Sequence, residues 1–161
     1  MVGYSTAIGL TEFGDDRIDH SPIIGWAYDG NPIYGPYGYD DASNSNSQIR
    51  NLATSYILST SDVVDRPSGF VNGFFVDDYK FDNSGDLDKH NGRYCKTPEF
   101  PNGVYAYFVG INTNTQTSVF PYFIGNSYRS KLIEQSFDQT FDFNNSDLVR
   151  NTLPYLSLIH I

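Results

Sequence analysis

Residues 20 to 38 read HSPIIGWAYDGNPIYGPYG, and they are the most informative part of the sequence. Proline presets the backbone of many tight turns, and Asp, Asn and Gly supply turn side chains or a positive φ. The tyrosines and the tryptophan between these turn formers can fill a core from short segments. Residues 15 to 40, which share this composition, are therefore predicted to be an ordered loop region of successive tight turns rather than regular elements.

The rest of the chain has a similar composition. Its 161 residues are enough for one domain, and they include 13 Tyr, 12 Phe, 14 Gly and 8 Pro but a single Met. Aromatic residues favour strands, whereas Gly and Pro favour turns. We expect a mainly β single domain with one short helix and long ordered loops rich in Gly, Pro and Tyr.

Residues 104 to 109 are apolar or aromatic throughout, so they predict a central strand buried on both faces. Residues 74 to 80 and 119 to 124 are the next best strands, although Pro121 favours an edge or a bulge for the latter. Asn-Gly pairs begin at three positions and predict turns with positive φ: Asn72, Asn91 and Asn102.

One segment has the periodicity of a helix. Its apolar residues fall at the spacing of one helix face: Ile49, Leu52, Ala53, Tyr56 and Ile57. Ser45 followed three residues later by Gln48 fits a capping box. We therefore predict a helix over residues 47 to 57 that packs through Leu52, Ala53 and Tyr56.

The charge of the chain restricts its partners. Nineteen acidic and ten basic residues give a formal net charge of −9, which repels phosphate backbones and anionic lipid surfaces. We expect neither nucleic acid nor a membrane as a partner. Cys95 is the only cysteine, so the chain contains no intramolecular disulfide. The first ten residues have no basic start and no apolar run, so they do not resemble a signal peptide.

Residues 20 to 38 resemble the hallmark stretch of the YHYH domain family, roughly H-x-P-I-I-G-[YW]-A-x-D-G-x-P-I-Y-G. Further blocks follow in the order of that family, and the resemblance covers residues 18 to 130. These blocks are residues 85 to 88, 91 to 93, 97 to 101, 103 to 108 and 120 to 122. Where many members read Tyr-His-Tyr-His, this chain reads Tyr105-Ala106-Tyr107-Phe108, so both tyrosines are kept and both histidines are replaced.

The family occurs in secreted bacterial proteins and in large structural proteins of marine phages, and its function is largely undefined. The sequence after Ser118 resembles the phage members. The resemblance therefore implies a virion component of a marine tailed phage. We expect residues 1 to 17 to be the N-terminal flank of a longer protein, residues 18 to 130 the YHYH-like domain, and residues 131 to 155 the start of a following segment. Residues 156 to 161, LSLIHI, resemble translated sequencing-adapter read-through.

Two groups of residues are candidate metal or catalytic sites. His20 and Asp29 could bind a divalent metal or orient a general base, or they could serve the loop by bonding a carbonyl and by capping the Asp-Gly-Asn-Pro turn. Asp82, Ser84, Asp86 and Asp88 place oxygen ligands at alternate positions, as in the first half of a calcium loop, and the candidate carboxylates are Asp82, Asp86 and Asp88. Arg93 stands where such a loop needs its bidentate Glu, so calcium binding is expected to be weak at most.

Other chemistry has less support in the sequence. Cys95 could pair with His90 or His20, but no family signature surrounds it, and a buried inert thiol is expected. The motifs G-x-S-x-G, H-E-x-x-H, G-x-G-x-x-G and the P-loop are absent from the sequence. Five aromatic residues could stack against a sugar, although core packing explains them more simply: Trp26, Tyr28, Tyr34, Tyr37 and Tyr39.

These observations favour a non-catalytic structural or interaction module of a phage virion protein, of the tail-fibre or baseplate type, with no cofactor. Its expected partners are other virion proteins or a host surface glycan. Two alternatives stay open: a secreted or cell-surface enzyme or metal-dependent protein centred on His20 and Asp29, and a carbohydrate-binding module. The candidate functional surface comprises His20, Asp29, Tyr34, Tyr37, Tyr105 and Tyr107. Too few nitrogen and sulfur donors are present to predict tight transition-metal binding.

Overall fold

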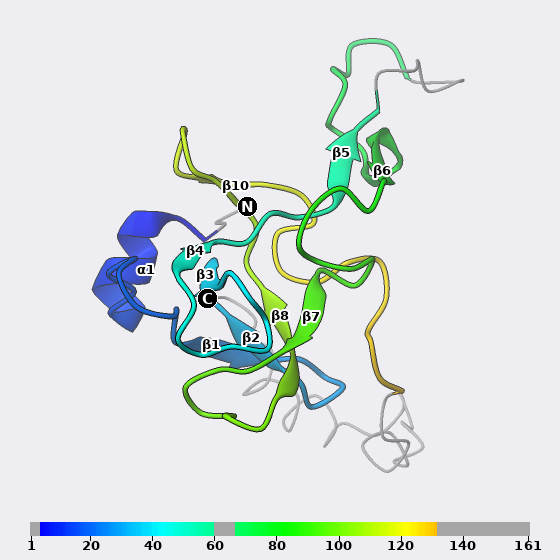
Figure 1. Cartoon of the computed structure of the whole chain (residues 1–161). Coiled ribbons are helices and arrows are strands. Elements are labelled where there is room, and N and C mark those ends of the chain that lie inside the picture. The colour runs from blue at the N-terminus through cyan, green and yellow to red at the C-terminus, as the bar shows by residue number, and fades with distance from the viewer. Residues whose placement is uncertain (1–3, 60–66, 132–161) are drawn as a thin grey trace, which may run out of the picture. The chain divides into compact units, whose positions relative to one another are not determined.

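A computed structural model describes residues 4–59 and 67–131 of the chain (Figure 1). One compact unit spans Gly3–Ser130. Its helices are the α-helix α1 (Thr6–Phe13) and the 3-10 helix η1 (Val76–Asp78). Its strands are β1 (Ile23–Trp26), β2 (Pro32–Tyr34), β3 (Tyr37–Tyr39), β4 (Ile49–Asn51), β5 (Tyr56–Leu58), β6 (Tyr79–Phe81), β7 (Gly92–Cys95), β8 (Val104–Phe108), β9 (Ile111–Asn112) and β10 (Thr117–Ser118). The predicted mainly β class with one short helix is confirmed.

The largest sheet has four strands in the order β1-β2-β8-β7, so β8 lies between β2 and β7 (Figure 1). β8 runs parallel to β2 and antiparallel to β7. The other strands form three two-stranded sheets, β3-β4, β5-β6 and β9-β10. The central strand predicted at residues 104 to 109 is confirmed, because Ala106, Tyr107 and Phe108 are fully buried inside the four-stranded sheet.

Alternation along β8 divides its side chains between two faces of the sheet. Ala106 and Phe108 belong to a buried cluster with Tyr34, Leu52, Leu87 and Cys95, and we call this side the core face. Tyr105 and Tyr107 occupy the opposite side, where their rings meet edge to face with centroids 5.3 Å apart. We call this side the tyrosine face. The two tyrosines and the two replaced histidine positions therefore lie on opposite faces of the sheet.

Helix α1 begins after Ser5, whose Oγ accepts a hydrogen bond from the backbone N–H of Ile8, and it ends at Gly14, where φ is 70°. It lies within residues 1 to 17, which the sequence assigns to a flank. Tyr4, just before the helix, packs with Val109 and Ile111 in a second buried cluster. Thus residues before position 18 are part of the same compact unit as the sheet.

The helix predicted over residues 47 to 57 is wrong. That segment forms β4 and β5, and its backbone groups bond to distant segments instead of to each other. The N–H of Leu52 donates to Pro36 O, and the Asp86 carboxylate accepts from the N–H of Ala53. Leu52 is fully buried as predicted, but Ala53 is exposed. Hydrogen bonds to distant segments outweigh a helical periodicity that rests on only five apolar residues.

Two predicted strands are also wrong in part. Residues 74 to 80 contain η1 (Val76–Asp78) in place of the first part of the predicted strand, because the Asp78 carboxylate accepts the N–H groups of Gly73 and Phe75. The strand β6 starts only at Tyr79. Residues 119 to 124 form turns rather than a strand, and one of them is closed by the N–H of Tyr122 donating to Val119 O.

The loop region predicted for residues 15 to 40 contains three short strands, β1, β2 and β3, joined by tight turns. The predicted turns at the Asn-Gly pairs are confirmed by positive φ at Gly73, Asn91 and Gly103. Residues 156 to 161 and all but the first residue of 131 to 155 lie outside the described residues. Within the described part of the chain, no helix has the length and apolar character needed to cross a membrane.

Candidate functional site

The tyrosine face is organised around the carboxylate of Asp29, which lies in the turn between β1 and β2. The Tyr107 hydroxyl donates to Asp29 Oδ2 over 2.7 Å, and Nδ2 of Asn31 donates to the same oxygen over 2.8 Å. The backbone N–H of Ser130 donates to it as well, over 3.1 Å. Asp29 Oδ1 accepts the N–H of Asn31 over 3.3 Å, so Asp29 caps its own turn as the sequence predicted.

These contacts set the charge states of the pair. Burial alone would raise the pKa of the Asp29 carboxyl, but the hydrogen bonds from Tyr107, Ser130 and Asn31 together hold it below its usual value. Burial raises the pKa of the Tyr107 hydroxyl, and the neighbouring Asp29 carboxylate raises it further. Asp29 is therefore a charged acceptor and Tyr107 a neutral donor near neutral pH. Oδ2 accepts three of the four hydrogen bonds, so this oxygen is poorly placed to act as a general base.

The second tyrosine repeats the arrangement with another carboxylate. The Tyr105 hydroxyl lies 2.8 Å and 3.0 Å from the two oxygens of Asp88. Asp88 Oδ1 also accepts the backbone N–H groups of His90 and Gly92, so it holds the turn that leads into β7. Burial and the Asp88 carboxylate both raise the pKa of the Tyr105 hydroxyl. Each tyrosine of the tetrapeptide thus joins β8 to a turn elsewhere in the chain.

Residues 125 to 130, which we call the strap, cross the tyrosine face. The N–H of Arg129 donates to the Tyr107 hydroxyl over 2.8 Å, and its guanidinium lies 5.5 Å from the centre of the Tyr105 ring. His90 bonds the strap at two places, with Nδ1 2.8 Å from Ser127 O and its carbonyl accepting the N–H of Gly125 over 2.9 Å. Tyr107 therefore donates to Asp29 and accepts from the strap, and it links three segments of the chain.

His20 lies on the core face. Its ring contacts Tyr34 and Tyr39, both with centroids 5.0 Å away, and Phe108 at 5.9 Å. His20 Nδ1 lies 2.8 Å from Ser21 O, and a carbonyl can only accept, so Nδ1 carries the proton of the neutral ring. Nε2 is buried and has no hydrogen-bond partner among the described residues. Burial lowers the pKa of His20, although the Ser21 carbonyl opposes that shift.

His20 and Asp29 do not share a site. Asp29 bonds Tyr107, whereas His20 packs against Phe108, and neighbouring strand residues point to opposite faces of a sheet. The remaining two candidates are also separated. Tyr34 is fully buried, and its hydroxyl donates to the Glu99 carboxylate and lies 2.9 Å from the Thr97 hydroxyl, from which it can accept. Tyr37 is half-buried against the second cluster. Only Asp29, Tyr105 and Tyr107 of the six candidate residues gather in one place.

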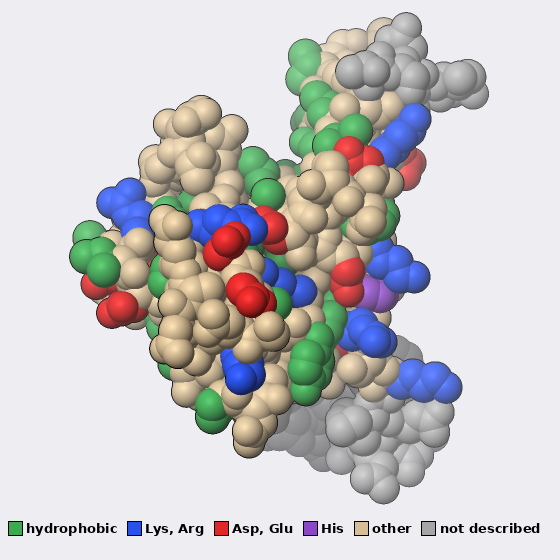
Figure 2. Space-filling model, viewed as in Figure 1, with side chains coloured by type: hydrophobic (Ala, Val, Ile, Leu, Met, Phe, Trp, Pro, Cys, Tyr) green, Lys and Arg blue, Asp and Glu red, His purple; other side chains and the backbone are tan. Residues whose placement is uncertain are grey.

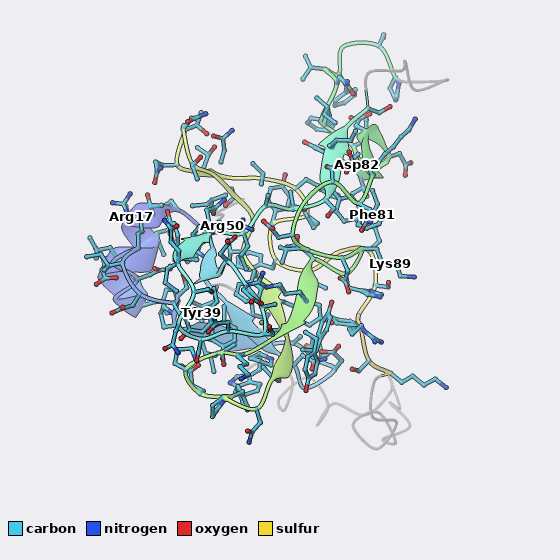
Figure 3. The ribbon with its side chains drawn as sticks, viewed as in Figure 1. Arg17, Tyr39, Arg50, Phe81, Asp82 and Lys89 are labelled. Carbon is cyan, nitrogen blue, oxygen red and sulfur yellow. The ribbon has the colours of Figure 1, made fainter. Side chains whose placement is uncertain are left out.

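The three carboxylates of the calcium alternative have different partners. Asp86 forms a bidentate ion pair with Arg50, at 2.7 Å and 2.6 Å, while Asp82 bonds its neighbour Ser84. Asp88 bonds Tyr105. Figure 3 shows Asp82 well apart from Arg50, which holds Asp86. No group of three or more His, Cys, Asp and Glu side chains suited to a metal ion occurs within residues 4–59 and 67–131.

Cys95 has no catalytic environment. It is 2% exposed in the apolar core, and burial raises the pKa of its thiol, which opposes formation of the nucleophilic thiolate. The nearest strong cation, Arg93, acts in the opposite direction but does not outweigh burial. The thiol is buried as predicted, and the alternative of a pair with His90 is not supported, because His90 Nδ1 bonds the strap.

A buried polar network near the N-terminus was not foreseen in the sequence. Asp15 Oδ2 accepts the hydroxyls of Tyr4 at 2.8 Å and Ser21 at 2.6 Å, and Ser21 Oγ accepts the N–H of Tyr37. The strap contacts of Arg129 and Ser130 were missed as well. The sequence does not predict these contacts. A carboxylate in a turn can be recognised from the sequence, but the distant hydroxyl or N–H group that donates to it cannot.

The family model described as YHYH protein matches residues 6–121. The matched region runs from the first residue of α1 through the four-stranded sheet, and it includes Asp29, Asp88 and both tyrosines of the tyrosine face. No curated protein and no solved structure matches the chain.

Proposed function

The chain belongs to the YHYH protein family, and we propose that it is a non-catalytic structural or interaction module of a phage virion protein, of the tail-fibre or baseplate type. The virion assignment is supported by the sequence after Ser118, which resembles phage members of the family. The non-catalytic assignment is supported by the geometry of the two faces of β8. In this proposal the module acts through its fold and its surface, without a cofactor.

The main observation behind the proposal concerns Asp29, the one carboxylate among the six candidate residues. Asp29 accepts four hydrogen bonds from the protein itself. A catalytic carboxylate needs a free lone pair within reach of substrate. Asp29 instead connects the first turn region, β8 and the strap. His20, its supposed partner, lies on the other face of the sheet. Both residues are therefore better explained as parts of the fold than as parts of an active centre.

The surface also favours a role in binding. Large apolar side chains are exposed on and around β5 and β6, and Figure 2 shows hydrophobic side chains gathered there. They are Ile57, Leu58, Phe70, Val71, Phe74, Val76 and Phe81. Exposed apolar patches are typical of surfaces that contact other macromolecules, and Phe70 and Phe74 of this group have their ring centroids 4.6 Å apart. Such contacts fit the partners that we propose, namely other virion proteins or a host surface glycan.

Mass spectrometry of purified particles tests the virion assignment. Phage particles are isolated by density-gradient centrifugation from lysates of the host that carries the gene. The secreted fraction of the same culture is collected for comparison. We expect peptides of this chain in the particle band, at a constant ratio to the major capsid protein. Peptides confined to the secreted fraction would contradict the assignment and would favour the secreted or cell-surface protein.

A further inference from the structure

Three turns of this fold contain an Asn-Gly pair, and they begin at Asn72, Asn91 and Asn102. In such a pair the backbone nitrogen of the Gly, after losing its proton to solvent, can attack Cγ of the Asn side chain. The bond from Cγ to Nδ2 breaks and ammonia leaves. Water then opens the cyclic succinimide to Asp or to iso-aspartate, so an amide becomes an acid without an oxidant or a cofactor. The contacts at each turn determine which pair can react.

Both reacting groups of the pair at Asn91 are held by the fold. The Asn91 side chain is fully buried, and its Nδ2 donates to Phe108 O over 2.7 Å and to Phe123 O over 3.1 Å. The N–H of Gly92 donates to the Asp88 carboxylate over 3.3 Å. That contact opposes loss of the proton, because the nitrogen anion would then face a second negative charge. Attack at this pair is therefore disfavoured.

The pair at Asn72 shares the carboxylate contact, although Asn72 itself is exposed. The N–H of Gly73 donates over 2.9 Å to Oδ2 of Asp78, whose side chain is fully buried. Nδ2 of Asn72 donates to Ser59 O over 2.8 Å. The Asp78 carboxylate opposes formation of the Gly73 nitrogen anion, as Asp88 does at Gly92.

The pair at Asn102 differs in both respects. It lies in the loop that joins β7 to β8 (Figure 1). Asn102 is exposed, and its side-chain amide makes no hydrogen bond within the described part of the chain. The N–H of Gly103 donates over 3.0 Å to Phe100 O, which is a neutral acceptor. A bond to a neutral carbonyl opposes loss of the proton less than a bond to a carboxylate does.

A cation lies near this third pair. Asn102, Gly103 and Lys96 line the same surface hollow of about 290 Å³, and Lys96 is the one charged residue among the described residues of that lining. Asp41, a carboxylate close enough to sense Lys96, accepts the N–H and the hydroxyl of Ser43. Oδ1 of Asn102 gains negative charge as the nitrogen attacks, and a nearby ammonium stabilises such an oxyanion. The same ammonium favours the carboxylate of the product.

We propose that Asn102 is a site of spontaneous deamidation and that it reacts ahead of Asn72 and Asn91 in the folded chain. The reaction adds one negative charge to a chain whose formal net charge is −9, at the turn that leads into β8. The iso-aspartate product also lengthens the backbone of that turn. This inference goes beyond the proposed function and does not depend on the virion assignment.

Peptide mapping of the aged full chain by mass spectrometry tests the proposal. The purified chain is kept folded at pH 7.4 and 37 °C, and the converted fraction of each Asn is followed with time. We expect Asn102 to convert at least about tenfold faster than Asn72 and Asn91, a ratio that corresponds to a barrier difference of about 1.4 kcal/mol. In denaturant the three pairs should convert at similar rates, because the contacts that distinguish them are then lost.

Two lysine variants separate the effect of the cation from that of exposure. Lys96→Gln should slow conversion of Asn102 about threefold, as expected for a partly screened charge. Lys89→Gln removes the same charge at an exposed position labelled in Figure 3 and should leave the rate unchanged. Asn102→Gln should abolish the acidic species that isoelectric focusing detects in the aged chain.

Three results would count against the inference. The proposal is overturned if Asn72 or Asn91 converts as fast as Asn102 in the folded chain, or if Asn102 leads by the same ratio in denaturant. An unchanged rate in Lys96→Gln, or an equal loss in Lys89→Gln, would overturn the role assigned to Lys96.

Discussion

On one face of β8, Tyr105 and Tyr107 each donate a hydrogen bond to a carboxylate, whereas on the other face Ala106 and Phe108 pack among apolar side chains. The tyrosine face is polar, and its contacts reach the turns at Asp29 and Asp88 and the strap. The core face is apolar and holds His20 as a neutral ring. The same four-residue segment thus supports two different kinds of interaction.

This difference explains how the tetrapeptide can lose its histidines without losing its fold. The two replaced positions both point to the core face, where Phe108 stacks on Tyr34 with ring centroids 5.6 Å apart. The two retained tyrosines both point to the tyrosine face. A change on one face does not remove the hydrogen bonds on the other. The predictions below separate the contributions of the two faces.

The largest expected effect is the loss of Tyr107. Replacing Tyr107 with Ala should lower the free energy of unfolding by about 3 to 5 kcal/mol, because the substitution removes a fully buried ring and leaves Asp29 without its hydroxyl donor. Chemical denaturation measures the change. Tyr94, on the same face but 69% exposed, is the matched control, and Tyr94→Ala should cost less than about 1 kcal/mol. A loss under about 1 kcal/mol for Tyr107→Ala would show β8 to be peripheral.

The two faces should also lose stability in different pH ranges. The pKa of His20 in the folded state lies below its unfolded value of about 6.5. The neutral His20 ring therefore makes its full contribution to the free energy of unfolding above that pH, and this contribution is lost as the pH falls toward the folded pKa. The folded pKa of Asp29 lies below its unfolded value of about 3.9, so its contribution is present above that pH and is lost on further acidification.

Denaturation curves recorded from pH 7 to pH 3 measure both ranges. His20→Phe should flatten the pH dependence of the free energy of unfolding between pH 6.5 and the lower folded pKa of His20. The unfolded variant has no imidazole at this position that could take up a proton. Asp29→Asn should reduce the loss below about pH 4 and leave the higher range unchanged. If Asp29→Asn instead flattened the pH dependence of the free energy of unfolding near pH 6, the result would contradict the description of the two faces.

The smallest expected effect is that of transition metals. His20 lies on the core face, His90 bonds the strap, and Cys95 is buried, so no two of these donors converge. Structural zinc sites need three or four donors at fixed distances. Calorimetric titration with zinc or copper should show no equivalent bound more tightly than about 1 μM. One such equivalent, lost on His20→Ala, would revive the metal-dependent alternative.

The sequence predicts local features well and distant ones poorly. The buried strand was predictable because six consecutive residues are apolar or aromatic, and the turn at Asp29 because Asp-Gly-Asn-Pro is a local signal. Helix α1 could have been found from Ser5 as its N-cap and Gly14 as its C-cap. The contacts that decide the rest join residues far apart in the chain.

Two of those contacts show why. Arg50 is held by Asp86, 36 residues away, and this ion pair fixes the extended segment where a helix was predicted. Tyr107 meets Asp29 across 78 residues, and the strap reaches Asp29 across 101. Both Tyr107 and Asp29 were candidates from the sequence, but their contact depends on the register of β2 beside β8. Sequence patterns within one segment do not determine such a register.

A double-mutant cycle on Tyr107 and Asp29 is the most direct measurement of the role that we assign to the tyrosine face. The single variants are Tyr107→Phe and Asp29→Ala, and the free energies of unfolding of both and of the double variant are compared with that of the unaltered chain. A hydrogen bond to a buried carboxylate predicts a coupling of about 1.5 to 3 kcal/mol. A coupling below about 0.5 kcal/mol would contradict the account, because the Tyr107 hydroxyl would then not hold Asp29 in place.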